Sequence, residues 1–276
     1  MKRVIIPTDF SLAAINAAIF AFDLYKNKKV EFYLVHAYQI PYTMPEIVPV
    51  GGEMIQQELK TTLNKEVDKL KQFTKYSKLS IKPILKFGNP GVCISELVKE
   101  LKADSVVLGT TGASNLKDVF FESSAFDIVE AVECPAWVIP IEARFESLRN
   151  LMFAADFIAM QNKNVLAPLV DLATDRNSFV QILNVYDTEN DGDIEQEGIT
   201  FFKTLQQNKI DHGYKLIHQK ESVEDTLLDY VKQNETDLLI LVKRHYGFIK
   251  SLFHHSVTRG MTFHADAPIL VLHDNE

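Results

Sequence analysis

The sequence predicts an α/β fold of two tandem open-sheet domains, each with a mostly parallel five-stranded sheet flanked by helices. Strand-like and helix-like segments alternate along the chain, which is typical of a parallel sheet with crossover helices. The strand-like segments are continuous apolar runs, as expected for strands buried on both faces. Three landmarks of the first half recur in the same order in the second half, which indicates a duplicated domain.

Each landmark has one counterpart: the apolar run ending in Asp9-Phe10 and that ending in Asp156-Phe157, the segments 30–38 and 179–186, and the segments 134–140 and 267–273. A charged stretch, residues 141–149, separates the two sets and is expected to hold the boundary. We therefore expect domains at 1–142 and 148–276. The length of 276 residues suits two domains of about 100–150 residues each.

Apolar spacing and capping signals place the elements of the first half. Ser11 is expected to cap a helix whose alanines allow close packing on a sheet. Prolines and glycines between Pro41 and Gly52 indicate a loop. The long helix after it has one apolar face, formed by Leu59, Leu63, Val67, Leu70 and Phe73. The expected strands are 4–8, 30–37, 81–86, 105–108 and 136–139, and the expected helices are 12–26, 53–76, 92–102 and 122–132.

The second half repeats this pattern with one difference. An acidic loop, residues 187–193, stands where the first half has its proline-rich loop. Together with the recurring strand runs, this predicts a second sheet of the same kind.

Composition excludes several classes of protein. Hydrophobic residues make up 46% and charged residues 24% of the chain, which is ordinary for a packed globular protein. No apolar run reaches about 18 residues, so no membrane span is expected, and the first residues do not form a signal peptide. We therefore expect a cytoplasmic protein, whose two cysteines stay reduced. The net charge of −8, all of it in the second half, argues against a nucleic-acid partner.

Three segments of the first half are expected to meet beyond the carboxyl ends of the strands, where open α/β sheets bind ligands. They are Pro7-Thr8-Asp9 after the first strand, His36-Ala37 at the end of the second, and the stretch from Gly109 to Ser124. Glycines allow close approach of a ligand to the backbone. Hydroxyls and N–H groups at a helix start, where Ser123 and Ser124 are expected, suit a phosphate.

These residues resemble the universal stress protein family in its tandem two-domain form. Nucleotide-binding members carry G-x2-G, nine residues, and then G-[S/T]; here Gly109-x2-Gly112 is followed by nine residues and Glu122-Ser123. Pro7-Thr8-Asp9-Phe10-Ser11 and Cys134-Pro135 also look like the family. The resemblance implies an adenine-nucleotide alpha-hydrolase-like fold that binds AMP, ADP or ATP, with or without Mg²⁺. It implies a binding site made of Pro7, Thr8, Asp9, Ala37, Gly109, Thr111, Gly112, Ser123 and Ser124, with Asp9 at the adenosine, Ala37 at the adenine and the glycines and serines at the phosphates.

Glu122 departs from the family pattern because it replaces the second phosphate-site glycine. A carboxylate 4 Å from a phosphate charge repels it by about 1 kcal/mol in water, and more in a drier site. Three outcomes are open: AMP in place of ATP, adenosine bound without phosphate contact, or no nucleotide. Glu122 also has a purely structural interpretation, since an acidic residue stabilises the start of a helix.

The second domain has lost the motif, with Val242 and His245 at the glycine positions; only Asp156 and Ser256 remain. Seven of the eight histidines lie there, which raises the hypothesis of a metal-dependent enzyme, but their spacing is not that of a metal site. No catalytic set is evident, so at most slow ATP hydrolysis is expected. One interpretation of Cys93, which lies at a predicted helix start, is a thiol with a lowered pKa.

The alternative to a nucleotide-binding stress protein is an interaction module that binds a partner protein or an apolar ligand. Residues 42–50, apolar and proline-rich, could cover such a pocket. The resemblance also implies an internal pseudo-dimer of the two domains through segments 134–140 and 267–273. A homodimer and an unknown protein partner are further expectations.

Overall fold

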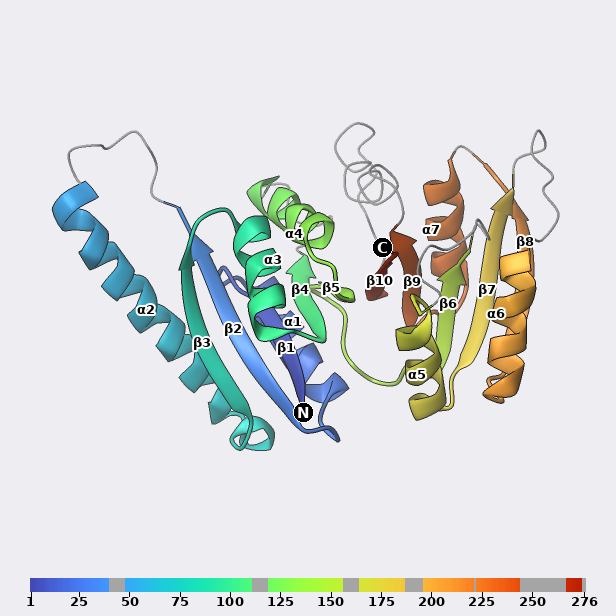
Figure 1. Ribbon diagram of the computed structural model, residues 1–276, viewed down its shortest axis with the longest axis horizontal. Coiled ribbons are helices and arrows are strands. Elements are labelled where there is room, and N and C mark those ends of the chain that lie inside the picture. Colours follow the sequence, from blue (N-terminus) through green and yellow to red (C-terminus); the bar gives the residue numbers. More distant parts are fainter. Residues whose placement is uncertain are drawn as a thin grey trace. The chain divides into compact units, whose positions relative to one another are not determined.

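The computed structural model describes residues 1–39, 48–110, 119–155, 164–186, 196–220, 222–243 and 267–274. The chain divides into two compact units. Met1–Thr110 and Val119–Ile141 belong to the first unit, and Glu142–Glu276 belongs to the second. Each unit is an α/β sandwich of one sheet between helices, which confirms the predicted fold class (Figure 1).

The first unit has a parallel sheet of five strands in the order β3-β2-β1-β4-β5. The chain starts in the middle strand, adds strands on one side, and then crosses over to add them on the other. Central strands are almost wholly apolar: Val4, Ile5 and Ile6 of β1 have no exposed surface. The strands are β1 (Lys2–Pro7), β2 (Val30–Tyr38), β3 (Ser80–Phe87), β4 (Ser105–Thr110) and β5 (Ala136–Pro140).

Helices cover both faces of this sheet. The helices are α1 (Leu12–Leu24), α2 (Val48–Gln72), α3 (Pro90–Leu101) and α4 (Val119–Ala131), with a short 3₁₀ helix η1 (Thr74–Tyr76). α3 and α4 contact each other on one face, and α1 and α2 lie on the opposite face (Figure 1). The two sets follow from right-handed crossovers, because the chain changes direction along the sheet after β3.

Helix α1 packs unusually close to the sheet. Its N-cap is Ser11 as predicted, with the Ala14 N–H donating to Ser11 Oγ at 3.1 Å. Its five alanines are all buried: Ala13, Ala14, Ala17, Ala18 and Ala21. Small side chains let the helix backbone approach β4 and β5, which it contacts directly.

Helix α2 differs from the prediction at both ends. It begins at Val48, inside the stretch predicted as a loop, because a proline such as Pro49 is tolerated in the first turn of a helix. It ends at Gln72, so Phe73 is extended and 53% exposed, whereas Leu63, Val67 and Leu70 are buried as predicted. The prediction that Phe73 lies on the buried face of this helix was therefore wrong.

The second unit has the same strand order when its strands are counted from β6: β8-β7-β6-β9-β10, all parallel. Its strands are β6 (Asn150–Ala154), β7 (Phe179–Tyr186), β8 (His212–His218), β9 (Leu238–Lys243) and β10 (Ile269–His273). Its helices are α5 (Ala167–Arg176), α6 (Gln196–Gln207) and α7 (Val223–Gln233). The predicted acidic loop, residues 187–193, lies outside the described residues.

The outer strands β3 and β8 have different compositions. β3 contains Pro83 and two lysines, Lys82 and Lys86. β8 has no proline, and its Tyr214 and Leu216 are 37% and 49% exposed. Among the residues that the structure describes, no helix is long and apolar enough to cross a bilayer.

Candidate functional site

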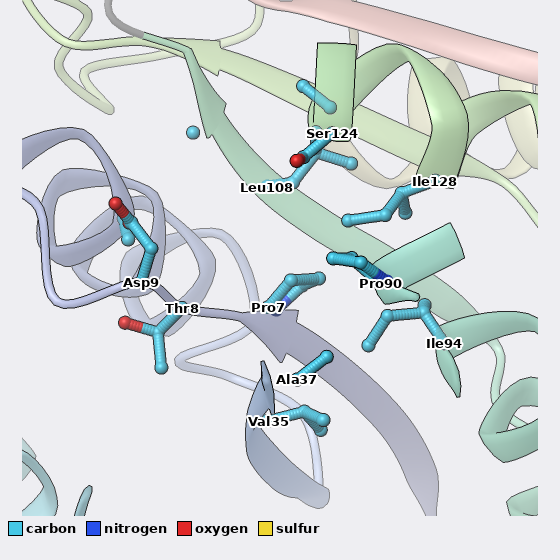
Figure 2. Close-up of a pocket in the computed structure, with 13 residues that line it drawn as sticks. Pro7, Thr8, Asp9, Val35, Ala37, Pro90, Ile94, Leu108, Ser124 and Ile128 are labelled. Carbon is cyan, nitrogen blue, oxygen red and sulfur yellow. The ribbon is translucent and has the colours of Figure 1, made fainter. Parts of the chain in front are cut away.

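A cavity of about 230 Å³ opens beyond the carboxyl ends of β1 and β4 (Figure 2). The connections leaving these neighbouring strands run to opposite faces of the sheet, which makes the gap between them the switch point where open α/β sheets bind ligands. The lining comes from both faces and from the strand ends: Pro7, Thr8, Asp9, Ala14, Val35, Ala37, Pro90, Ile94, Leu108, Gly109, Ser124, Ala125 and Ile128.

Six of the nine predicted site residues line this cavity: Pro7, Thr8, Asp9, Ala37, Gly109 and Ser124. Thr111 and Gly112 lie outside the described residues, and Ser123 is placed only as part of helix α4. Figure 2 shows Thr8 and Asp9 on one side of the cavity and Ser124, Ile128, Pro90 and Ile94 on the other. The structure thus brings the ends of β1, β2 and β4 and the start of α4 together around one space.

The apolar side chains that α3 and α4 contribute to the cavity wall were not predicted from the sequence. α3 contributes Pro90 and Ile94, and α4 contributes Ala125 and Ile128. A usable signal was present in Asn89-Pro90, because an Asn cap followed by Pro at the first helical position marks a helix start. The Val92 N–H donates to Asn89 Oδ1 at 3.3 Å, so α3 begins two residues before the predicted start.

The turn after β1 is built from its own polar side chains. Thr8 Oγ1 accepts a hydrogen bond from the Phe10 N–H at 3.0 Å, and Asp9 Oδ1 accepts one from the Ser11 N–H at 3.1 Å. Ser11 then caps α1. This chain of short-range bonds fixes the direction in which Asp9 leaves the strand, at the edge of the cavity.

Asp9 is the only titratable side chain among the described lining residues. Burial raises the pKa of its carboxyl above the usual value, while hydrogen bonding to Ser11 and the neighbouring His36 ring act in the opposite direction. Its hydrogen bonds come from within the turn, from Ser11 and from its own backbone. A half-buried carboxylate oxygen beside apolar walls is suited to accept hydrogen bonds from a ligand's hydroxyl or amino groups.

Gly109 has a packing role that the sequence did not reveal. A Cβ on this residue would overlap the carbonyl group of Ala13 in α1 and would lie 2.9 Å from Ala14 N. The glycine therefore permits the close contact between α1 and β4, whether or not a ligand is bound. Its presence alone does not indicate a phosphate site.

Helix α4 begins at Val119, three residues before the predicted start at Glu122. The N–H groups without helical partners are those of the first turn, which begins at Val119. Ser123 and Ser124 lie further along, where backbone N–H groups bond within the helix. Ser124, which lines the cavity, can therefore offer a ligand its hydroxyl rather than its N–H group.

The cysteines do not behave as reactive thiols. Burial raises the pKa of Cys93, with Glu96 adding to the rise, so a lowered pKa at this helix start is wrong. Burial raises the pKa of Cys134 to about 12. Both are free and buried.

No cluster of three or more potential metal ligands occurs within the described parts of the chain. His212, His218 and His273 lie on different strands of the second unit or at opposite ends of one strand. The other histidines of that unit, at 245, 254, 255 and 264, lie outside the described residues, as do Asp156 and Ser256.

Comparison with known proteins agrees with this architecture. The model of the universal stress protein family matches residues 1–140. A universal stress protein of Methanocaldococcus jannaschii is 27% identical over 138 residues, which are 50% of this chain and 81% of that protein. The match covers half of the chain, and the chain belongs to the universal stress protein family.

Two solved structures extend the likeness in fold to both units. The crystal structure of a universal stress protein from Archaeoglobus fulgidus has a TM-score of 0.73 at 13% identity, covering 99% of this chain and 97% of that one. A protein of unknown function from Pseudomonas aeruginosa has a TM-score of 0.54 at 8% identity, covering 99% and 93%. At these identities the likeness shows the fold alone.

Proposed function

We propose that the first unit binds an adenine nucleoside or nucleotide, AMP, ADP or ATP, in the cavity between β1 and β4. The protein would act in a cytoplasmic stress response or in signalling, with little or no catalysis. One observation carries the proposal: the half-buried Asp9 carboxylate stands at the edge of a mainly apolar cavity at the switch point of the sheet.

The chemistry of the lining suits the two halves of a nucleoside. Asp9 can accept hydrogen bonds from ribose hydroxyls, in the manner of an acidic residue in dinucleotide-binding folds. Val35, Ala37, Ile94 and Ile128 offer apolar surface against which a flat base can lie. Helix α4 then points its first turn toward this edge of the sheet, and the Ser124 side chain faces the same space.

Phosphate binding depends on two opposing features. The helix start of α4 favours an anion through its N–H groups and dipole. Glu122, in the same helix, adds a negative charge where the family has a glycine. We therefore expect affinity to fall, or to rise little, from adenosine to AMP to ATP, instead of increasing with the number of phosphates.

The test combines ligand identification with matched variants. Freshly purified protein is denatured and its released small molecules are identified by mass spectrometry; adenosine, AMP and ATP are then titrated calorimetrically. Asp9→Asn should weaken all three ligands, whereas Asp127→Asn, the same change on an exposed position of α4, should weaken none. Glu122→Gly should raise ATP affinity relative to adenosine. A chain that carries no adenine compound and binds none of the three contradicts the proposal.

A second candidate function rests on the character of the lining. Apart from Thr8, Asp9 and Ser124, every described residue of the cavity wall is apolar or glycine. An apolar ligand could occupy such a space, with the protein serving as an interaction module for a partner. Native mass spectrometry separates the two: a retained hydrophobic compound, together with no response to adenosine, favours this function.

A further inference from the structure

The pairing of β1 with β2 stops at the cavity wall. Its last pair is Pro7 with Val35, where the Thr8 N–H donates to the Val35 carbonyl at 2.8 Å. In a continuing parallel ladder, the Thr8 carbonyl would next accept a hydrogen bond from the Ala37 N–H. The structure does not show that pair. The Thr8 carbonyl instead lies 2.7 Å from Nδ1 of the His36 ring.

The donor in this contact follows from simple chemistry. A carbonyl oxygen only accepts, so His36 Nδ1 carries the proton and donates it. The imidazole therefore takes the place of the backbone donor that would have closed the ladder. His36 is in β2, immediately before Ala37, which lines the cavity.

Phe10 holds this ring in place. The ring centroids of Phe10 and His36 are 4.5 Å apart with a tilt of 36°. Phe10 has a φ of 69°, in the left-handed region that bulky residues rarely adopt. The Phe10 N–H donates to Thr8 Oγ1, and the Ser11 N–H donates to Asp9 Oδ1 across it. An uncommon backbone conformation held in this way at the edge of a site points to a local geometry that serves a purpose.

We infer that His36 is a positioning residue: its ring ends the β1–β2 ladder at Thr8 and so keeps the Ala37 N–H available to the cavity as a hydrogen-bond donor. The direction of this N–H follows from the strand. The Val35 carbonyl points toward β1, and residues two apart in a strand point to the same side, so the Ala37 N–H also points toward β1 and the cavity. The ligand would carry a hydrogen-bond acceptor atom on a flat ring. This part of the inference rests on the proposed function, in which the ligand is a nucleoside or nucleotide.

Two variants of His36 separate the donor from the ring. In His36→Asn, the side-chain Nδ2 occupies the place of Nδ1 and keeps the donor. In His36→Phe, the aromatic contact with Phe10 is kept and the donor is lost. Without the donor, the Thr8 carbonyl should recruit the Ala37 N–H and the ladder should lengthen by one rung.

The primary measurement is residue-resolved amide hydrogen exchange of Ala37 in the full chain by NMR, without ligand. The amide should exchange readily in the wild type and in His36→Asn, and about tenfold more slowly in His36→Phe. A merely structural role for His36 predicts the opposite sign, faster exchange once the hydrogen bond is lost. A wild-type Ala37 amide as protected as those of Phe32 and Leu34 in the middle of β2, or unchanged exchange in His36→Phe, would overturn the inference.

The ligand arm uses adenosine. Its affinity should fall about three- to tenfold in His36→Phe, the effect of one hydrogen bond, and stay within twofold of wild type in His36→Asn. Equal losses in both variants contradict the assignment. If the wild type binds no adenosine, the proposed function fails, while the exchange result still decides the role of His36. If His36→Phe does not fold, the wild-type Ala37 amide and the ¹⁵N signature of an Nδ1-protonated His36 decide it.

Discussion

Replacing Gly109 by alanine should destabilise the first unit even in the absence of any ligand. The added Cβ would overlap the Ala13 carbonyl and approach Ala14 N to 2.9 Å, and both atoms belong to a helix backbone that cannot rotate away. Overpacking of this kind costs about 3 kcal/mol at the upper end of the usual range, and alanine recovers about 0.5–1 kcal/mol of unfolded-state entropy. The expected net loss is about 2 kcal/mol in the free energy of unfolding.

Tryptophan fluorescence in urea measures this loss in the right unit. Trp137, the only tryptophan of the chain, is buried in β5 of the first unit, next to the strand that carries Gly109. Gly213→Ala in the second unit is the matched control and is followed by circular dichroism, because its new Cβ would meet only the ends of the Phe179 and Gln181 side chains, at 3.0 and 3.1 Å. A Gly109→Ala protein as stable as wild type would refute the packing argument. If it also lost adenosine, the glycine would serve the ligand alone.

Three further predictions concern single groups. Asp9→Asn should equal or exceed the wild type in stability at pH 7, because burial raises the pKa of Asp9 and so disfavours its charged form in the folded state. This advantage should shrink as the pH falls through the raised pKa and should be gone at about pH 4, the unfolded-state value. Urea midpoints at pH 7 and at about pH 4 measure this, and a variant that is less stable at pH 7 contradicts it. Burial raises the pKa of Cys134 to about 12, so iodoacetamide at pH 8 should alkylate this thiol roughly a thousandfold more slowly in the native than in the urea-unfolded chain. Peptide mass spectrometry measures both rates. Comparable rates would rule out the burial argument. Ser11→Ala should lower the free energy of unfolding by about 1 kcal/mol, because the Ala14 N–H loses its capping acceptor. Ser11→Asn should restore most of this loss in the same urea assay. No recovery would mean that capping is not the cause.

Local signals predicted most of the fold because they act over a few residues. The Ser11 cap, the alanine-rich helix and the apolar strand runs are all readable from neighbouring positions. The start of α2 was missed because Pro49 and the two glycines after it look like a loop, although the first helical turn accepts proline. The exposure of Phe73 depends on where the helix stops, which apolar periodicity alone does not fix.

The candidate site also contains some residues that could be predicted from the sequence and others that could not. Asp9, Ala37 and Gly109 could be placed because each lies at or just beyond the carboxyl end of a strand in a parallel sheet, where the fold brings strand ends together. Ile94 and Ile128 could not, since an apolar residue on a helix looks the same whether it faces the core or a cavity. The close approach of Gly109 to Ala13 and the contact between Phe10 and His36 arise from tertiary packing that no local pattern encodes.

The contrast between the outer strands β3 and β8 bears on self-association under the heat or crowding that a stressed cell imposes. An outer strand offers unpaired N–H and C=O groups to any other strand, and proline and lysine are the usual protection. β3 has both, and its exposed Phe87 is its last residue, whereas β8 combines one lysine with the exposed apolar surface of Tyr214 and Leu216 in its middle. When chains collide, β8 is the strand on which intermolecular β-pairing should begin. Self-association through the second unit, which lacks the glycine motif, would then limit the concentration at which the first unit stays available to its ligand.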